Sequence, residues 1–89
     1  MKILTAFTTG KGTSIPCEYF NLNDGFVHQW QFNSNEIADS VFALIKGRPQ
    51  SYSGWKLKMR RNGRLYLFNR GVGNYYDADV RAAVGELDQ

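Results

Sequence analysis

The sequence predicts an α+β domain in which two amphipathic helices pack on one face of a mainly antiparallel sheet of five strands. Three observations favour this class. Apolar residues alternate with polar ones over residues 15–20 and 26–32, and the apolar spacing changes to that of a helix after Asn33. An Asn62-Gly63 pair lies between two further strand-like segments. The 89 residues, 43% of them hydrophobic, suffice for a single domain over residues 1–89 and are too few for two.

Three strands are predicted in the first part of the chain. Residues 2–9 are rich in β-branched and aromatic types and stop at the turn sequence Gly10-Lys11-Gly12. A second strand begins at Ile15, and residues 26–32 form a third after the turn sequence Asn23-Asp24-Gly25. A turn within this sequence pairs the second and third strands with Tyr19 opposite Trp30 and Cys17 opposite Phe32. Both apolar rows then share one face of the sheet.

The first helix is predicted over residues 34–46. Asn33 is expected to cap it, with Glu36 reaching back in a variant of the capping box. The apolar stripe consists of Ile37, Val41, Leu44 and Ile45. Gly47 ends the helix.

A basic hairpin is predicted next, because Asn62-Gly63 is typical of a two-residue type I′ turn. That turn pairs Lys58 with Leu67 and Leu57 with Phe68. The core face then holds Trp55, Leu57, Met59, Tyr66 and Phe68, and the other face holds Lys56, Lys58, Arg60, Leu65, Leu67 and Asn69. This second face, to which Gln29 and Gln31 also belong, is where water or a ligand is expected to lie.

A second helix is predicted from about residue 77, after the glycine turn Gly71-Val72-Gly73-Asn74. Asp77 and Asp79 favour a helix N-terminus, and Val80, Val84 and Leu87 recur at helical spacing. The predicted element order is therefore β-β-β-α-β-β-α.

The positive charge is concentrated in one segment. Residues 46–70 carry +8 with no acidic residue, whereas the rest of the chain sums to −5. Cations interleaved with aromatic residues are typical of surfaces that contact phosphates and bases. The predicted binding residues are Lys56, Lys58, Arg60, Arg61, Arg64 and Arg70 of the hairpin, with Arg48 and Tyr52 of the preceding loop extending the phosphate contacts.

The function predicted from this segment is nucleic-acid binding, to DNA or RNA, by a small non-enzymatic protein that uses the basic hairpin face. A two-stranded ribbon also fits the major groove of B-DNA. Two other interpretations stay open. In the first, the protein is a small inhibitor or adaptor that binds an acidic surface of a larger nucleic-acid-processing complex. In the second, the cations only keep the hairpin soluble and prevent edge pairing. In size and basic hairpin it is similar to small phage or mobile-element accessory proteins, a likeness of type that no motif carries.

Composition argues against metal binding and most catalysis. One cysteine, Cys17, excludes an intramolecular disulfide and is expected to be a small buried hydrophobe. One histidine, His28, excludes His-rich, His/Cys zinc and two-His iron sites, so no metal or cofactor is expected. Since His28 alternates with aromatic residues on the apolar face, it is predicted to be buried and not catalytic. An RNA-cleaving activity that uses Arg60, Arg64 and Tyr52 to stabilise phosphate charge is the remaining catalytic alternative.

The sequence also predicts a cytoplasmic protein without a membrane partner. No apolar run approaches the roughly 18 residues of a membrane span. The first residues lead directly into a strand-like pattern without the apolar core of a signal peptide.

Overall fold

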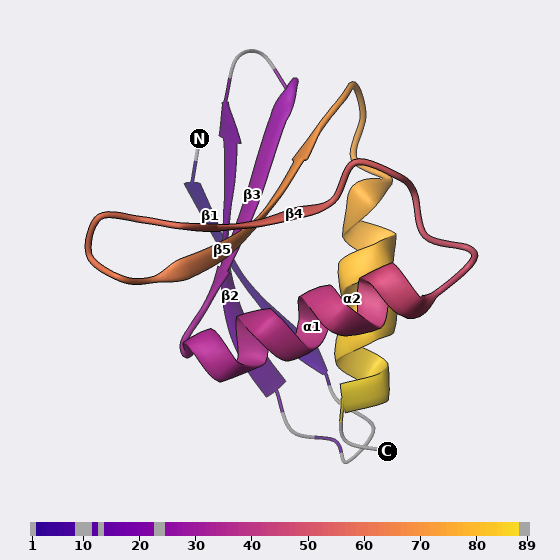
Figure 1. The fold of residues 1–89 in the computed structure, drawn as a ribbon, viewed down its shortest axis with the longest axis horizontal. Helices are drawn as coiled ribbons and strands as arrows, with labels where there is room; N and C mark the ends of the chain where they lie inside the picture. The colour runs from indigo at the N-terminus through magenta and orange to yellow at the C-terminus, as the bar shows by residue number, and fades with distance from the viewer. Residues whose placement is uncertain (1, 9–11, 13, 23–24, 88–89) are drawn as a thin grey trace.

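The chain forms one open antiparallel sheet and two helices (Figure 1), in a computed structural model that describes residues 2–8, 12, 14–22 and 25–87. The elements are β1 (Lys2–Thr8), β2 (Ser14–Leu22), β3 (Val27–Phe32), α1 (Asn35–Gly47), β4 (Lys56–Met59), β5 (Leu65–Arg70) and α2 (Tyr76–Leu87). The strands lie in the order β1-β2-β3-β5-β4, and every neighbouring pair is antiparallel. The predicted α+β class and element order are confirmed. Among the described residues, no helix is both long and apolar enough to cross a membrane.

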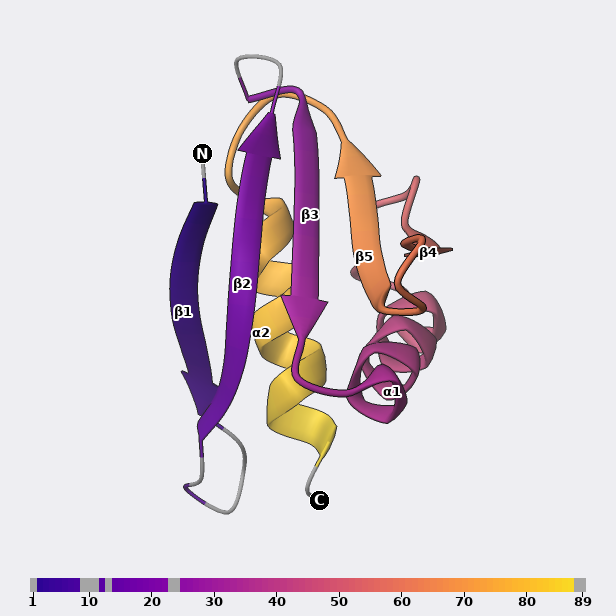
Figure 2. The same cartoon turned by 90° about the vertical axis from the view of Figure 1, so that its left-hand side faces the viewer.

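Both helices lie on the same face of the sheet, as predicted. Figure 1 shows α1 and α2 on one side of the strands, and Figure 2 shows the other side, with β1, β2, β3 and β5 in front of the helices. The core between sheet and helices includes Phe7, Cys17, Trp30, Phe32, Val41, Ile45, Trp55, Leu67, Val80 and Val84, all buried. We call the uncovered side of the sheet the open face.

The predicted pairing of β2 with β3 is confirmed. Tyr19 lies opposite Trp30 and Cys17 opposite Phe32, and their alternation places both pairs on the helix side. The turn residues proposed for this hairpin, Asn23 and Asp24, lie outside the described residues, as do Gly10 and Lys11 of the first predicted turn.

The predicted register of β4 and β5 is wrong by one residue. Lys58 lies opposite Tyr66, and Leu57 lies opposite Leu67. The loop has three residues, because the Arg60 N–H donates to the Arg64 carbonyl at 2.9 Å and the Gly63 N–H donates to the Arg60 carbonyl at 2.9 Å. Gly63 has φ +85°, and a turn followed by a glycine in this conformation is the usual three-residue hairpin.

This shift exchanges the two faces of β5, because side chains alternate with a period of two. Tyr66 and Phe68, predicted on the core side, share the open face with Lys56 and Lys58. The row predicted to face solvent faces the helices instead and consists of Leu65, Leu67 and Asn69. Leu67 and Asn69 are buried. The three-residue turn places the row that contains Arg70 on the open face, so this cation does not have to be buried in the core. For β4 the prediction is confirmed for Trp55, which is buried, and for Lys56 and Lys58, which are exposed, but Met59, predicted on the core side, is 63% exposed at the end of the strand.

The N-terminus of α1 differs from the prediction by one residue and is tied to the hairpin. Ser34, not Asn33, is the N-cap, and its hydroxyl accepts from the Ile37 N–H at 3.2 Å. The next side chain, Asn35, donates to the Gly63 carbonyl at 2.8 Å and accepts from the Leu65 N–H at 3.0 Å. These two bonds hold the turn of the hairpin against the start of the helix.

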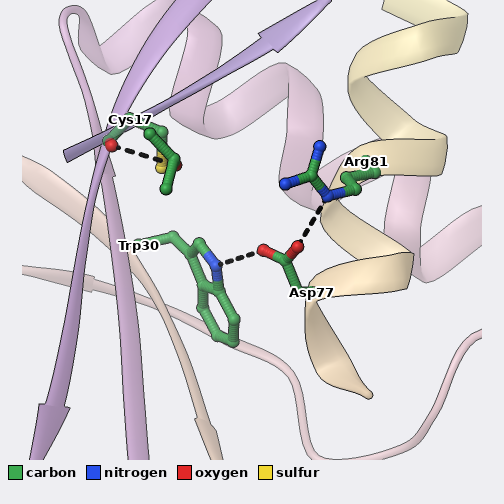
Figure 3. Close-up of polar contacts among 5 residues, drawn as sticks. Cys17, Trp30, Asp77 and Arg81 are labelled. Atoms are coloured by element: carbon green, nitrogen blue, oxygen red, sulfur yellow. Dashed lines mark hydrogen bonds and ion pairs between the residues drawn. The ribbon is translucent and has the colours of Figure 1, made fainter. Parts of the chain in front are cut away.

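The N-terminus of α2 is anchored by the two tryptophans of the core. The Trp30 indole donates to Asp77 at 3.3 Å, and Asp77 also pairs with Arg81 at 2.7 Å (Figure 3). The Trp55 indole donates to the buried Asp79 at 2.9 Å. The acidic residues predicted to favour the start of the helix therefore also fix its position over the sheet, and α2 begins at Tyr76, one residue before the predicted start.

Candidate functional site

The open face of the hairpin carries cations and aromatic rings together. Lys56, Lys58 and Arg70 are exposed, and between them the rings of Tyr66 and Phe68 are half-buried. Because β5 pairs with β3, this surface continues over the amides of β3, which are Gln29 and Gln31, to Phe20 on β2. We call this surface, from Lys56 to Phe20, the basic face.

Phe68 lies at the outer part of the basic face. Lys56 is its cross-strand partner on β4. The Lys58 ammonium lies 4.0 Å from the centroid of the Phe68 ring. An exposed cation–π contact of this kind contributes only about 0.5–1 kcal/mol, so Lys58 can leave the ring at low cost.

A hollow of about 370 Å³ lies against Phe68. It is lined by Gly54, Lys56, Lys58, Phe68, Asn69 and Arg70, without an acidic residue among them. Gly54 has φ +89°, and a Cβ placed on it would lie 3.3 Å from the Asn69 side-chain oxygen. The glycine therefore allows the sharp turn into β4 and keeps this side of the hollow open.

Arg60 belongs to the basic face but differs from its neighbours. Its guanidinium donates to the Gln31 side-chain oxygen at 2.7 Å and to that of Gln29 at 2.9 Å. It lies 4.3 Å from the Tyr66 centroid and 5.3 Å from that of Phe20. The expectation that Arg60 is exposed is wrong: the side chain is half-buried, because it bridges the hairpin to the central strands.

The other predicted binding residues are dispersed. Arg61 is exposed at the tip of the hairpin, and Arg64 is half-buried and donates to the Phe32 carbonyl. Arg48 forms an ion pair with Glu86 at 2.6 Å, so its charge is offset at the ends of the two helices. Tyr52 packs on Tyr75 and Tyr76, with centroids 4.7 and 5.7 Å away, beside the start of α2 on the helix side.

His28 is buried, as predicted, with 1% of its surface exposed. Its Nε2 lies 2.9 Å from the Gly71 carbonyl, which can only accept, so Nε2 carries the proton and donates. Nδ1 then accepts from the Tyr19 hydroxyl at 2.6 Å. Burial raises the pKa of Tyr19 above its ordinary value, against a hydrogen bond from Asn21 that lowers it. Both imidazole nitrogens are therefore occupied by structural hydrogen bonds.

A second cavity, of about 210 Å³, lies on the helix side. It is lined by Thr5, Tyr19, His28, Trp30, Asn74 and Asp77, and Figure 3 shows part of this region with the Trp30–Asp77–Arg81 contacts. Cys17 is buried nearby, and burial raises the pKa of its thiol. Within the described part of the chain, no three His, Cys, Asp or Glu side chains gather where they could hold a metal ion.

Sequence reasoning placed the cations and the two glutamines on the open face but missed the rings that accompany them. The available signal was the alternative row, which runs from Arg64 through Tyr66 and Phe68 to Arg70 and would point two cations at the core. Comparisons of the chain with protein-family models, with curated proteins and with solved structures found no match.

Proposed function

We propose that the protein binds nucleic acid through the basic face and catalyses no reaction. The observation that carries the proposal is the register of β4 and β5, which brings Tyr66 and Phe68 out among the cations. Cations that only kept a hairpin soluble would need no aromatic rings beside them. Leaving part of these rings in contact with water is also unfavourable, because their apolar surface is then not buried. Cations beside aromatic rings are a combination that proteins use to bind single-stranded nucleic acids.

The charges on this face are available to a ligand. No ion pair between described residues involves Lys56, Lys58 or Arg70, and all three are exposed. Each cation that neutralises a phosphate releases counterions, which is the main source of affinity for a nucleic acid. The three cations are therefore the expected phosphate contacts, with Arg61 at the tip of the hairpin as a fourth.

The arrangement of the titratable and cationic groups favours binding over catalysis. His28 is buried, and both its nitrogens are hydrogen-bonded. The three residues of the RNA-cleaving alternative lie apart: Arg60 is held on the open face, Tyr52 packs on the helix side, and Arg64 donates to the Phe32 carbonyl. No shared reacting centre is formed by them.

A charge reversal with a matched control tests this function. Lys58→Glu changes the charge of the basic face by two units, and Lys46→Glu makes the same change at an exposed position at the end of α1. Affinity for fluorescent single-stranded and duplex oligonucleotides is measured by anisotropy. Losing one phosphate contact at 0.1 M salt lowers affinity about five- to eightfold, so we expect at least this loss for Lys58→Glu and less than a twofold change for Lys46→Glu.

Equal losses in the two variants would contradict the proposal, because they would show only a dependence on net charge. Absence of binding by the unaltered protein would contradict it directly. If the unaltered protein instead captures an acidic protein from nuclease-treated lysate, and Lys58→Glu slows that association, the adaptor or inhibitor interpretation replaces nucleic-acid binding.

A further inference from the structure

We propose that the hollow around Phe68 holds one unpaired base, and that the ligand of the basic face is therefore a single-stranded nucleic acid. The inference rests on the proposed function and names its substrate class. It depends on three features of the hollow, which are its aromatic floor, its cationic rim and the ease with which the ring is uncovered.

The hollow has the composition of a nucleotide site. Phe68 offers a ring, and Lys56, Lys58 and Arg70 stand around it as phosphate partners. Its volume of about 370 Å³ lies within the range of about 300–1,000 Å³ that is usual for small-molecule sites. A base stacked on the ring thus has cations beside it for its own phosphate and for that of a neighbouring nucleotide.

Uncovering the ring is favourable. An exposed cation–π contact such as that between Lys58 and Phe68 is worth about two- to fivefold in an equilibrium constant. Stacking of a base on an aromatic side chain is worth about five- to 150-fold. The base therefore displaces the ammonium, which is on a flexible side chain and can move to a phosphate.

Phe68 is the ring best placed for this role. The Arg60 guanidinium lies over Tyr66 and near Phe20, and Gln29 and Gln31 hold it there. A cation fixed by two hydrogen bonds is harder to displace than the Lys58 ammonium, which has no hydrogen bond to any residue that the structure describes. Of the two rings on β5, Phe68 is therefore the one that a base uncovers more easily.

A duplex cannot use this ring. Its bases are already stacked on one another, and it presents only backbone phosphates and base edges to a protein surface. A duplex would contact the exposed lysines and Arg70 but would leave Phe68 under Lys58. The ring contributes affinity only when a base is unpaired.

Two variants at one position test the inference. Phe68→Leu keeps an apolar side chain and removes the ring, whereas Phe68→Tyr keeps the ring. Affinities are measured for an oligothymidylate of about twelve nucleotides, which spans a typical single-strand site, and for a hairpin duplex with the same number of phosphates. We expect the unaltered protein to bind the oligothymidylate at least fivefold more tightly, Phe68→Leu to lose about five- to 150-fold for it and under twofold for the duplex, and Phe68→Tyr to match the unaltered protein.

A third variant makes the test independent of lost stability. Phe68→Trp places an indole on the open face, while the native Trp30 and Trp55 are buried with 1% and 3% exposure. Oligothymidylate is expected to quench the added emission at saturation, and the duplex is expected to leave it unchanged.

The outcomes separate the two proposals. Tighter binding to the duplex, equal losses of both ligands in Phe68→Leu, or an unquenched indole would overturn the single-strand inference and leave nucleic-acid binding standing. Failure of the unaltered protein to bind either oligonucleotide would overturn both.

Discussion

Arg60 carries a positive charge on the open face, and its side chain also stabilises the fold through hydrogen bonds to β3. Sequence alternation correctly placed it on the open face, but its partners, Gln29 and Gln31, lie 31 and 29 positions earlier in the chain. Alternation assigns a side chain to a face and says nothing of what it reaches there. The same limit applies to Arg48, whose partner Glu86 is 38 residues away.

Arg60→Lys is expected to destabilise the protein by about 1–2 kcal/mol, because a lysine cannot keep both planar hydrogen bonds and the contact with Tyr66. Urea unfolding followed by circular dichroism measures the change. Arg61→Lys, at the exposed neighbouring position, is the control and is expected to change stability by less than about 0.5 kcal/mol. Equal stability of the two variants would show that the bonds to the glutamines contribute nothing.

The Cys17 thiol predicts a dependence of stability on pH. Burial, followed by the nearby Asp77 carboxylate, raises the pKa of Cys17 above its ordinary value of 9.0. Since the folded thiol stays protonated while the unfolded thiol ionises, the stabilisation is complete below pH 9 and is lost as the pH rises further. Each pH unit above 9 should remove up to about 1.4 kcal/mol.

Unfolding by urea at pH 8 to 10, on the unaltered protein and on Cys17→Ala, isolates this contribution. Tyr19 and Tyr76 also have raised pKa values, but both ordinary values are 10.0, and both groups are present in the two proteins. The variant is expected to lose less stability than the unaltered protein between pH 9 and 10. Parallel curves would contradict the assignment.

At the scale of elements, the turn of the hairpin decides which residues reach the open face. The Asn62-Gly63 pair is typical of two-residue turns, and that local preference gives way to a register in which Leu65 and Leu67 face the helices. The Asn35 side chain, at the start of α1, stabilises this register by hydrogen bonds to the Gly63 carbonyl and the Leu65 N–H. The Asn62-Gly63 motif favours one register of the hairpin, and its long-range contacts favour another. The long-range contacts prevail in the folded chain.

Gly63→Ala is expected to cost about 1–2 kcal/mol, because Gly63 has φ +85° and an L side chain is strained there. A Cβ at this position would meet no atom within 4 Å, so the cost is purely conformational. Gly47→Ala is the matched control: it too meets no atom, has no positive φ, and is expected to be neutral or slightly stabilising. A thermal melt that shows equal effects would contradict the three-residue turn.

The cap of α1 gives a second test at this scale. Ser34→Ala removes the hydroxyl that accepts from the Ile37 N–H and is expected to cost about 1 kcal/mol. Asn33→Ala, at the exposed position that sequence spacing favours as the cap, is expected to change stability by less than about 0.5 kcal/mol. The reverse order of the two effects in urea unfolding would restore Asn33 as the cap.

At the scale of the whole molecule, the fold places the hydrophobic core on the helix side of the sheet and Lys56, Lys58 and Arg70 on the open face. The fold class, the element order, the β2–β3 register and the helix stripes followed from hydrophobic periodicity, because that pattern is set by burial on one side of each element. The make-up of the basic face did not follow fully, since the positions of Phe68 and Tyr66 depend on a turn length that periodicity leaves open. Arg48 and Tyr52 lie away from it because the loop before β4 follows the helix side.

The salt dependence of binding should reflect this smaller set of cations. Three or four phosphate contacts, from Lys56, Lys58, Arg70 and Arg61, predict a slope of log affinity against log salt of about −2 to −3 for a single strand. If all seven cations predicted from the sequence made contacts, the slope would be about −5. Lys58→Glu should flatten the slope by about 0.7, as measured by anisotropy titrations between 50 and 300 mM salt.

The most direct measurement is a titration of the isotope-labelled protein with oligothymidylate, followed by amide chemical shifts residue by residue. The largest changes are expected for the amides of Lys56 to Lys58 and Phe68 to Arg70, with smaller ones for Gln29, while the amide shifts of α1 and α2 stay unchanged. Changes concentrated on the helices or around the helix-side cavity, with the hairpin unaffected, would contradict the assignment of the basic face as the binding surface.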